Sequence, residues 1–80
     1  MEKKEILTKV QNILRDVLDN KTLILDPQKS ADDIEEYDSL SHIQIVVAIE
    51  KEFNIKFTAK EIIDWDSFED MLSNISKKLS

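Results

Sequence analysis

The first apolar pattern of the chain covers residues 3–19 and has the period of a helix. Its apolar residues fall at intervals of four, three, one, three and one, at Ile6, Val10, Ile13, Leu14, Val17 and Leu18. Side chains at this spacing form a single stripe along an α-helix. The pattern therefore predicts an amphipathic first helix over residues 3–19.

No helical period continues into residues 20–38, which read NKTLILDPQKSADDIEEYD. Asp26 and Pro27 form a turn signal, and the Ser and Asp residues after them favour local hydrogen bonds over a helix. Such a long connection is uncommon in a compact domain and is usually functional or partly mobile. We expect it to be held to the core by its larger apolar side chains, Leu23, Leu25 and Ile34.

Apolar residues return with a helical period over residues 39–53. One broad side of this segment carries Leu40, Ile43, Val46, Val47, Glu50 and Phe53. Ile45 and Ile49 widen the apolar arc beyond what one core face needs. Ser41 and Gln44 have the spacing of a capping box just inside the start. We expect a second helix here, with more apolar side chains than one core face needs.

The next segment predicts an extended link and a short helix. Residues 53–57 (FNIKF) alternate in hydropathy, yet no second strand is available to pair with them. We expect a link that places its apolar side chains in the core. Thr58 and Glu61 have the spacing of a capping box and introduce a short helix to about Asp64.

A last helix follows, capped by Asp66 with Glu69 or by Ser67 with Asp70. Its apolar stripe consists of Phe68, Met71, Leu72, Ile75 and Leu79. The chain is therefore predicted to be all-α, a small four-helix bundle of three main helices and one short helix. A long loop joins helices 1 and 2, and residues 1–80 form one domain.

The composition supports helices and limits the available chemistry. The 80 residues include no glycine, one proline, no cysteine and one histidine. Tight hairpins usually need glycine. Without cysteine there are no disulfides or thiolates, and a single histidine argues against a transition-metal site.

The net charge of −6 argues against a nucleic-acid partner, because phosphate binding needs a basic face. It favours partners with basic patches, through electrostatic steering. No apolar run approaches the roughly 20 residues that span a bilayer, and MEKKEIL at the start lacks the apolar region of a signal peptide. We expect a monomeric cytoplasmic protein that does not insert into membranes.

Ser39, in the stretch EEYDSLSHIQIV, allows three interpretations. It could form a catalytic pair with His42, three residues along the same helix, but no glycine-rich backbone is present to build an oxyanion hole. The commonest role for such a serine is an N-cap or first-turn residue. A helix N-terminus also suits an attached phosphodiester, and Asp38 could help to hold the metal ion of a transferring enzyme.

The acidic loop does not match a calcium site. The stretch DPQKSADDIEEY has the length of an EF-hand loop, but Ala31 stands where glycine is required and Tyr37 where a bidentate glutamate is required. Its acidic residues instead indicate a solvated or docking face, made of Asp32, Asp33, Glu35, Glu36 and Asp38.

Residues 38–57 resemble the acyl carrier protein family. Asp38, Ser39 and Leu40 match the D-S-L motif at the start of the family's second helix. The later apolar positions and the F-x-I-x-F spacing also match, at Ile43, Val46, Val47, Ile49, Phe53, Ile55 and Phe57. The helical pattern and the long acidic loop extend the resemblance over almost the whole chain.

The resemblance implies that Ser39 carries a 4′-phosphopantetheine arm, with Asp38 and Leu40 beside it. A Mg²⁺-dependent phosphopantetheinyl transferase would transfer the arm from coenzyme A, and the terminal thiol would hold an acyl group as a thioester. The chain itself would be a carrier with no catalytic residue and no metal site of its own. Its other partners would be acyl-transferring, ligase or synthase enzymes.

The resemblance also implies a sheltered acyl chain and a docking face. The candidate pocket lining is Leu40, Ile43, Val47, Phe53, Ile62 and Ile63, residues that plain core packing would also explain. The candidate docking residues are Glu36, Ile43, Val47 and Glu50.

Departures from the family pattern point to a specialised pathway. Ser41 and Gln44 stand where fatty-acid carriers often have acids, and Lys51 stands at another commonly acidic position. Polyketide, peptide-like or surface-polymer assembly would fit, with fatty-acid synthesis as the other possibility. Asp38 argues against a peptidyl carrier, and Leu40 favours an acyl over a D-alanyl or aminoacyl carrier. The competing class is an interaction module of the same fold that has lost the arm.

Overall fold

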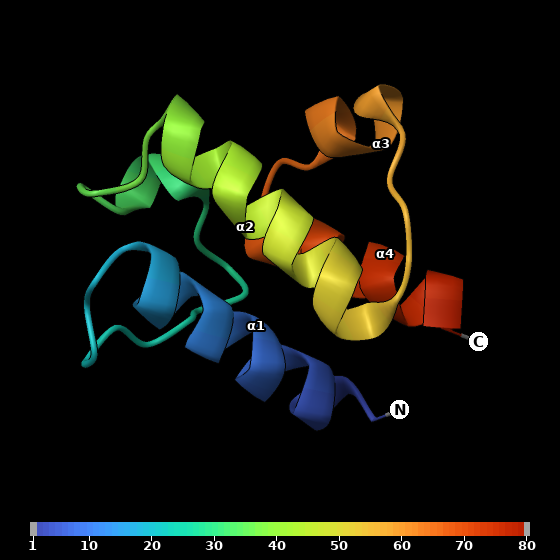
Figure 1. Ribbon diagram of the computed structural model, residues 1–80, viewed down its shortest axis with the longest axis horizontal. Coiled ribbons are helices and arrows are strands. Elements are labelled where there is room, and N and C mark those ends of the chain that lie inside the picture. Colours follow the sequence, from blue (N-terminus) through green and yellow to red (C-terminus); the bar gives the residue numbers. More distant parts are fainter. Residues whose placement is uncertain (1, 80) are drawn as a thin grey trace.

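The computed structural model describes residues 2–79, which fold into helices with no β-strand among them. The α-helices are α1 (Lys3–Val17), α2 (Ser39–Phe53), the short α3 (Ala59–Asp64) and α4 (Phe68–Leu79). One 3-10 turn, η1 (Ala31–Asp33), lies inside the long connection between α1 and α2 and was not predicted. The all-α class and the order of three main helices with one short helix are confirmed (Figure 1).

The hydrophobic core lies where α1 packs against α2 and α4. The apolar stripes predicted for the first and last helices both face it. Their buried members are Ile6, Val10 and Leu14 of α1, and Phe68, Met71, Leu72 and Ile75 of α4. The edges of the stripes are only partly buried, at Ile13, Val17 and Leu79. The helical period therefore predicted the packing faces of α1 and α4 correctly.

α1 ends at Val17, two residues before the predicted end. Asp19 adopts a left-handed backbone conformation with φ of 52°. The Asn20 N–H then donates to the Arg15 carbonyl at 3.0 Å, and the Asp19 N–H donates to the Asp16 carbonyl at 3.4 Å. This is a Schellman motif, which glycine usually supplies and which Asp19 supplies here.

The orientation of α2 corrects the predicted apolar side. Ile45 and Ile49, expected only to widen the arc, are 0% exposed and form the core face together with Val46 and Phe53. The surplus lies on the other flank of the helix, at Leu40, Ile43 and Val47. Apolar residues cover most of the circumference of α2, so the period alone did not determine which flank meets α1.

The connection over residues 20–38 is held to the core as predicted. Leu23 and Leu25 are buried, and Ile34 packs against the core cluster. Side chains of α1 also bind its backbone: Arg15 Nε donates to the Leu23 carbonyl at 2.6 Å, and Gln11 Oε1 accepts from the Leu25 N–H at 2.8 Å. The path of the loop along α1 is therefore specified by polar as well as apolar contacts.

The same connection caps the start of α4. The N–H groups of Phe68 and Glu69 donate to the carbonyls of Lys29 and Pro27, both at 2.9 Å. Asp70 Oδ2 accepts from the backbone N–H of Ser67 at 3.3 Å, so half of the predicted Ser67–Asp70 cap is present. The alternative pair does not form, because the Glu69 carboxylate instead contacts Lys3 at 3.3 Å.

The link after α2 and the start of α3 follow the prediction. Ile55 and Phe57 pack against the core from an extended segment. Thr58 and Glu61 form both halves of a capping box, with hydrogen bonds of 2.9 and 3.2 Å. A 3.0 Å ion pair from Glu61 to Lys78 joins α3 to α4. None of the helices in residues 2–79 has the length and apolar character needed to cross a membrane.

The core face of α2 can be tested with one conservative substitution on each flank. Ile45→Val should lower the free energy of unfolding by about 0.5–1.5 kcal/mol, because it removes a fully buried methylene group. Ile43→Val is the matched control on the exposed flank and should stay within about 0.5 kcal/mol. Urea denaturation measures both values, and equal losses would contradict the observed orientation.

Candidate functional site

Ser39 is the first residue of α2 and is exposed at the start of that helix. Asp38 is the N-cap, and its Oδ1 accepts from the Ser41 N–H at 2.8 Å. This hydrogen bond is the main cause that lowers the pKa of Asp38, so its carboxylate is charged at neutral pH. The predicted cap by Ser41 and Gln44 is wrong, because the N-cap is Asp38, three residues before the serine of that pair.

His42 bonds to a tyrosine and not to the serine one turn away. Its Nδ1 lies 2.7 Å from the hydroxyl of Tyr37, and the two ring centroids are 5.7 Å apart. The bond joins the last turn of the long connection to the first turn of α2. The structure therefore does not form the Ser39–His42 pair that a hydrolase would need.

Burial keeps both members of this pair neutral near pH 7. It raises the pKa of Tyr37 to about 12 and lowers the pKa of His42, because removal from water penalises a charged ring. The hydrogen bond between them therefore contains one proton, which belongs either to the Tyr37 hydroxyl or to His42 Nδ1.

The pair belongs to a row of aromatic side chains that sequence analysis missed. Tyr37 contacts Phe68 with centroids 6.2 Å apart, and His42 contacts Trp65 at 6.5 Å. Trp65 then meets Phe57 edge to face at 4.9 Å. These rings come from five segments of the chain, so no local spacing connects them, and only the concentration of aromatic residues after Tyr37 hinted at the row.

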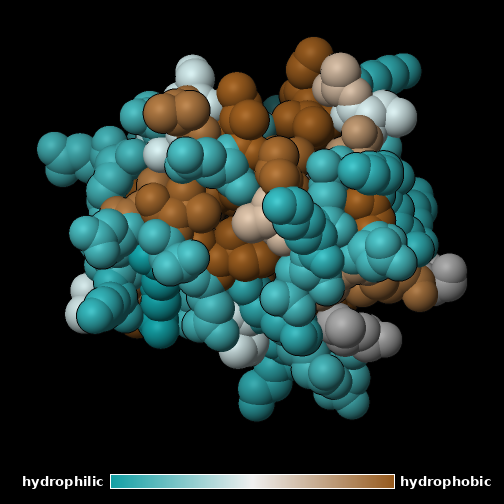
Figure 2. Space-filling view, in the orientation of Figure 1, coloured by the Kyte–Doolittle hydropathy of each residue, from teal (hydrophilic) through white to brown (hydrophobic). Residues whose placement is uncertain are grey.

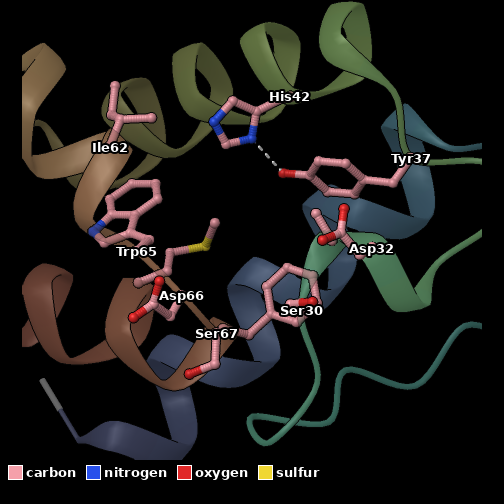
Figure 3. A pocket seen from close by; sticks show the side chains of 11 residues that line it. Ser30, Asp32, Tyr37, His42, Ile62, Trp65, Asp66 and Ser67 are labelled. Carbon is pink, nitrogen blue, oxygen red and sulfur yellow. Dashed lines mark hydrogen bonds between the residues drawn. The ribbon is translucent and has the colours of Figure 1, made fainter.

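Two depressions adjoin the Tyr37–His42 pair. The outer groove, about 450 Å³, includes the attachment motif and is lined by Ala31, Asp32, Tyr37, Asp38, Ser39, His42 and Ile43. The inner hollow, about 200 Å³, lies between the pair, Trp65 and the start of α4 (Figure 3). Its apolar wall is Ile62, Trp65, Phe68 and Met71, and its polar rim includes Ser30, Asp66 and Ser67. Ala31, Asp32, Tyr37 and His42 line both depressions.

The predicted acyl-pocket residues are not gathered around one hollow. Leu40, Ile43 and Val47 are 64%, 60% and 43% exposed. Ile63 is also exposed, while Phe53 lies in the core and only Ile62 reaches the inner hollow. Figure 2 shows apolar side chains gathered on the surface formed by α2 and α3. The assignment of these residues to an acyl pocket therefore stays a prediction.

The predicted docking residues differ in availability. Ile43 and Val47 are exposed, whereas both carboxylates bond within the chain. Glu36 accepts from Asn20 Nδ2 at 2.8 Å, which is the main cause that lowers its pKa. Glu50 Oε2 accepts from the Phe57 N–H at 2.8 Å. In the described residues no cluster of three or more side chains could hold a metal ion.

Comparisons with known proteins agree on one family. Residues 8–75 match the family described as "Phosphopantetheine attachment site". The chain is 32% identical over 76 residues to an acyl carrier protein of Acidothermus cellulolyticus, which covers 95% of this chain and 90% of the relative. The solution structure of holo acyl carrier protein from Geobacter metallireducens is similar at a TM-score of 0.85 and 34% identity, over 91% of this chain and 84% of that one.

The lowered pKa of His42 predicts a specific loss of stability in acid. The unfolded chain protonates His42 more readily than the folded chain does. The contribution of the neutral His42 to the free energy of unfolding is therefore fully present above the ordinary histidine pKa of about 6.5. It is lost as the pH falls below that value towards and through the lower folded pKa. Urea denaturation at several pH values measures the free energy of unfolding. In this range it should change less with pH for His42→Gln than for the wild type. Identical slopes for the two proteins would contradict the burial of a neutral imidazole.

Proposed function

The chain belongs to the acyl carrier protein family, and we propose that Ser39 is the residue that carries its 4′-phosphopantetheine arm. Members of this family are carriers with a covalently attached arm and are not enzymes. The thiol at the end of the arm holds the acyl group as a thioester. That thiol supplies the reactive sulfur that a chain without cysteine lacks.

The observation that carries the proposal is the exposed hydroxyl of Ser39 in the first turn of α2, next to an ionised aspartate. The first N–H groups of a helix lack partners within the helix and favour a phosphodiester nearby. The Asp38 carboxylate also lies where it could contribute to binding the Mg²⁺ of a transferase. Asp38 therefore has two roles in the proposal: it caps the start of α2, and it helps to bind the Mg²⁺ of the transferase.

The partners of such a carrier include a phosphopantetheinyl transferase and enzymes that handle acyl groups. We propose that they approach the side of α2 next to Ser39, where Ile43 and Val47 are exposed. Basic patches on these enzymes would respond to the net charge of −6, with Glu36 and Glu50 as nearby acids. Tethering raises the effective concentration of the acyl group at each enzyme, so a monomer in the cytoplasm would need only brief encounters.

We propose that this carrier serves a specialised pathway and not fatty-acid synthesis. From Ser39 to Ile49, α2 contains no Asp, Glu, Lys or Arg, and its outer flank is apolar at Leu40, Ile43 and Val47. An enzyme that reads a row of acids after the serine would find few of them here. This supports a polyketide, peptide-like or surface-polymer assembly system, with a D-alanyl or aminoacyl carrier as the alternative.

Intact mass tests the attachment site. After incubation with coenzyme A, Mg²⁺ and a broad-specificity transferase, the wild type should gain one phosphopantetheine. Ser39→Ala should gain none, and Ser41→Ala, a matched loss of hydroxyl two residues away, should gain as much as the wild type. Circular dichroism checks that each variant is folded. Modification of Ser39→Ala would refute the assignment, and an unmodified but folded wild type that carries no arm would favour the interaction module.

Reconstitution tests the pathway. A fatty-acid synthase assembled from purified enzymes should turn over at least about tenfold more slowly with this carrier than with the synthase's own carrier, since about 1.4 kcal/mol of lost docking energy has that effect. Equal rates for the two holo carriers would assign the chain to fatty-acid synthesis.

A further inference from the structure

The inner hollow lies within reach of the proposed attachment point. His42 is three residues after Ser39 on α2, so the two side chains lie on neighbouring positions of one helix face. The outer groove includes Ser39, and the Tyr37–His42 pair lines both depressions. An arm attached at Ser39 can therefore lie in the outer groove and place its end in the inner hollow by passing this pair.

The inner hollow has room for a short hydrocarbon. Phe68 and Met71, which form part of its wall, are almost completely buried, so the hollow reaches the core. Its volume is about 200 Å³. In another protein a cavity of about 150 Å³ lined by apolar side chains holds benzene, so this hollow suits about six to eight non-hydrogen atoms. A long alkyl chain does not fit without displacing core side chains.

The hydrogen-bonded Tyr37 and His42 form one polar side of the hollow, in addition to its rim of Ser30, Asp66 and Ser67. Figure 3 shows the two side chains facing each other above the hollow, with Trp65 across from them. The bond uses one proton of the pair, and the Tyr37 oxygen keeps a free lone pair. The second ring nitrogen of His42 is a donor or an acceptor according to the tautomer. A hydroxyl both donates and accepts, so it can bond to the pair in either tautomer.

The family implies a sheltered acyl chain, and from these contacts we infer that the inner hollow, when it holds this chain, favours a short acyl group that carries a hydroxyl. Tyr37 and His42 are its specificity-determining residues, because they line both depressions and so stand where an acyl group enters the inner hollow. The inference rests on the proposed attachment at Ser39. It assigns acyl binding to the space between the long connection, α2 and α4, whereas the exposed residues Leu40, Ile43 and Val47 remain available to partners.

The experiment compares acyl groups that differ in one hydroxyl. A broad-specificity transferase loads the wild type with butyryl, 3-hydroxybutyryl or octanoyl phosphopantetheine from the matching coenzyme A thioesters, and intact mass verifies each product. Trp65 is the single tryptophan of the chain, so its fluorescence reports directly on the wall of the hollow. Thermal melts of the same samples measure their stability, and amide NMR spectra show which residues lie near the acyl group.

With 3-hydroxybutyryl, we expect a melting temperature about 5 °C above that of the butyryl form, because one additional hydrogen bond forms only in the native state. The emission of Trp65 and the amide signals of Phe68 and Met71 should shift most for this acyl group. Tyr37→Phe keeps the ring and removes the hydroxyl, so it should load normally but lose the difference between the two acyl groups. Ile63→Ser, on the exposed side of α3, is the control and should retain that difference.

Two results would overturn the inference while leaving Ser39 as the attachment site. One is equal melting temperatures for the loaded butyryl and 3-hydroxybutyryl forms. The other is a set of NMR shifts concentrated at Leu40, Ile43 and Val47 with Trp65 emission unchanged. A wild type that gains no mass from any thioester would instead refute the proposed attachment itself.

Discussion

Hydrogen bonds from both α1 and α4 hold the backbone of the long connection that leads to Ser39. Gln11 and Arg15 bind the backbone of Leu25 and Leu23, and the first N–H groups of α4 bind the carbonyls of Pro27 and Lys29. These contacts satisfy polar groups that would otherwise be left without partners. At the end of the same connection Tyr37 contacts His42 of α2, and this pair lines both depressions beside Ser39.

The chain ends its helices without glycine. Asp19 and Asn54 adopt the left-handed conformation after α1 and at the end of α2, which Asn and Asp tolerate better than most residues. Helix starts are held by the side chains of Asp38, Thr58 and Asp70. In a domain of this size, which buries a modest core, such caps contribute a useful share of the stability.

The surroundings of Ser39 divide into two chemically different sides. The flank of α2 with Leu40, Ile43 and Val47 is apolar and exposed, which suits contact with other proteins. The other side contains the neutral Tyr37–His42 pair and leads to the inner hollow. In our proposals the apolar flank meets the partner enzymes and the inner hollow shelters the acyl group, so each task has its own surface.

Sequence and tertiary structure contributed different parts of this picture. Helical period predicted α1 and α4 with their core faces, because each has one apolar stripe. The Thr58–Glu61 box predicted the start of α3, because both partners are local. The D-S-L motif directed attention to Ser39, although its role as attachment site remains a proposal. The cap of α2 was predicted at the wrong residues, because Asp38, Ser39 and Ser41 are all good capping types and local pattern does not rank them.

What only the tertiary structure decided depends on contacts between distant segments. Ile45 and Ile49 face the core, and Ile43 and Val47 face outward, because α1 and α4 select one flank of a helix that is apolar on most sides. The row of rings from Phe57 to Phe68 and the hollow beside it form when the long connection, α2 and α4 come together. Local spacing encodes which helices form and how they begin. It does not encode the rotation of one helix against another, because that choice depends on the summed burial of all the helices at once.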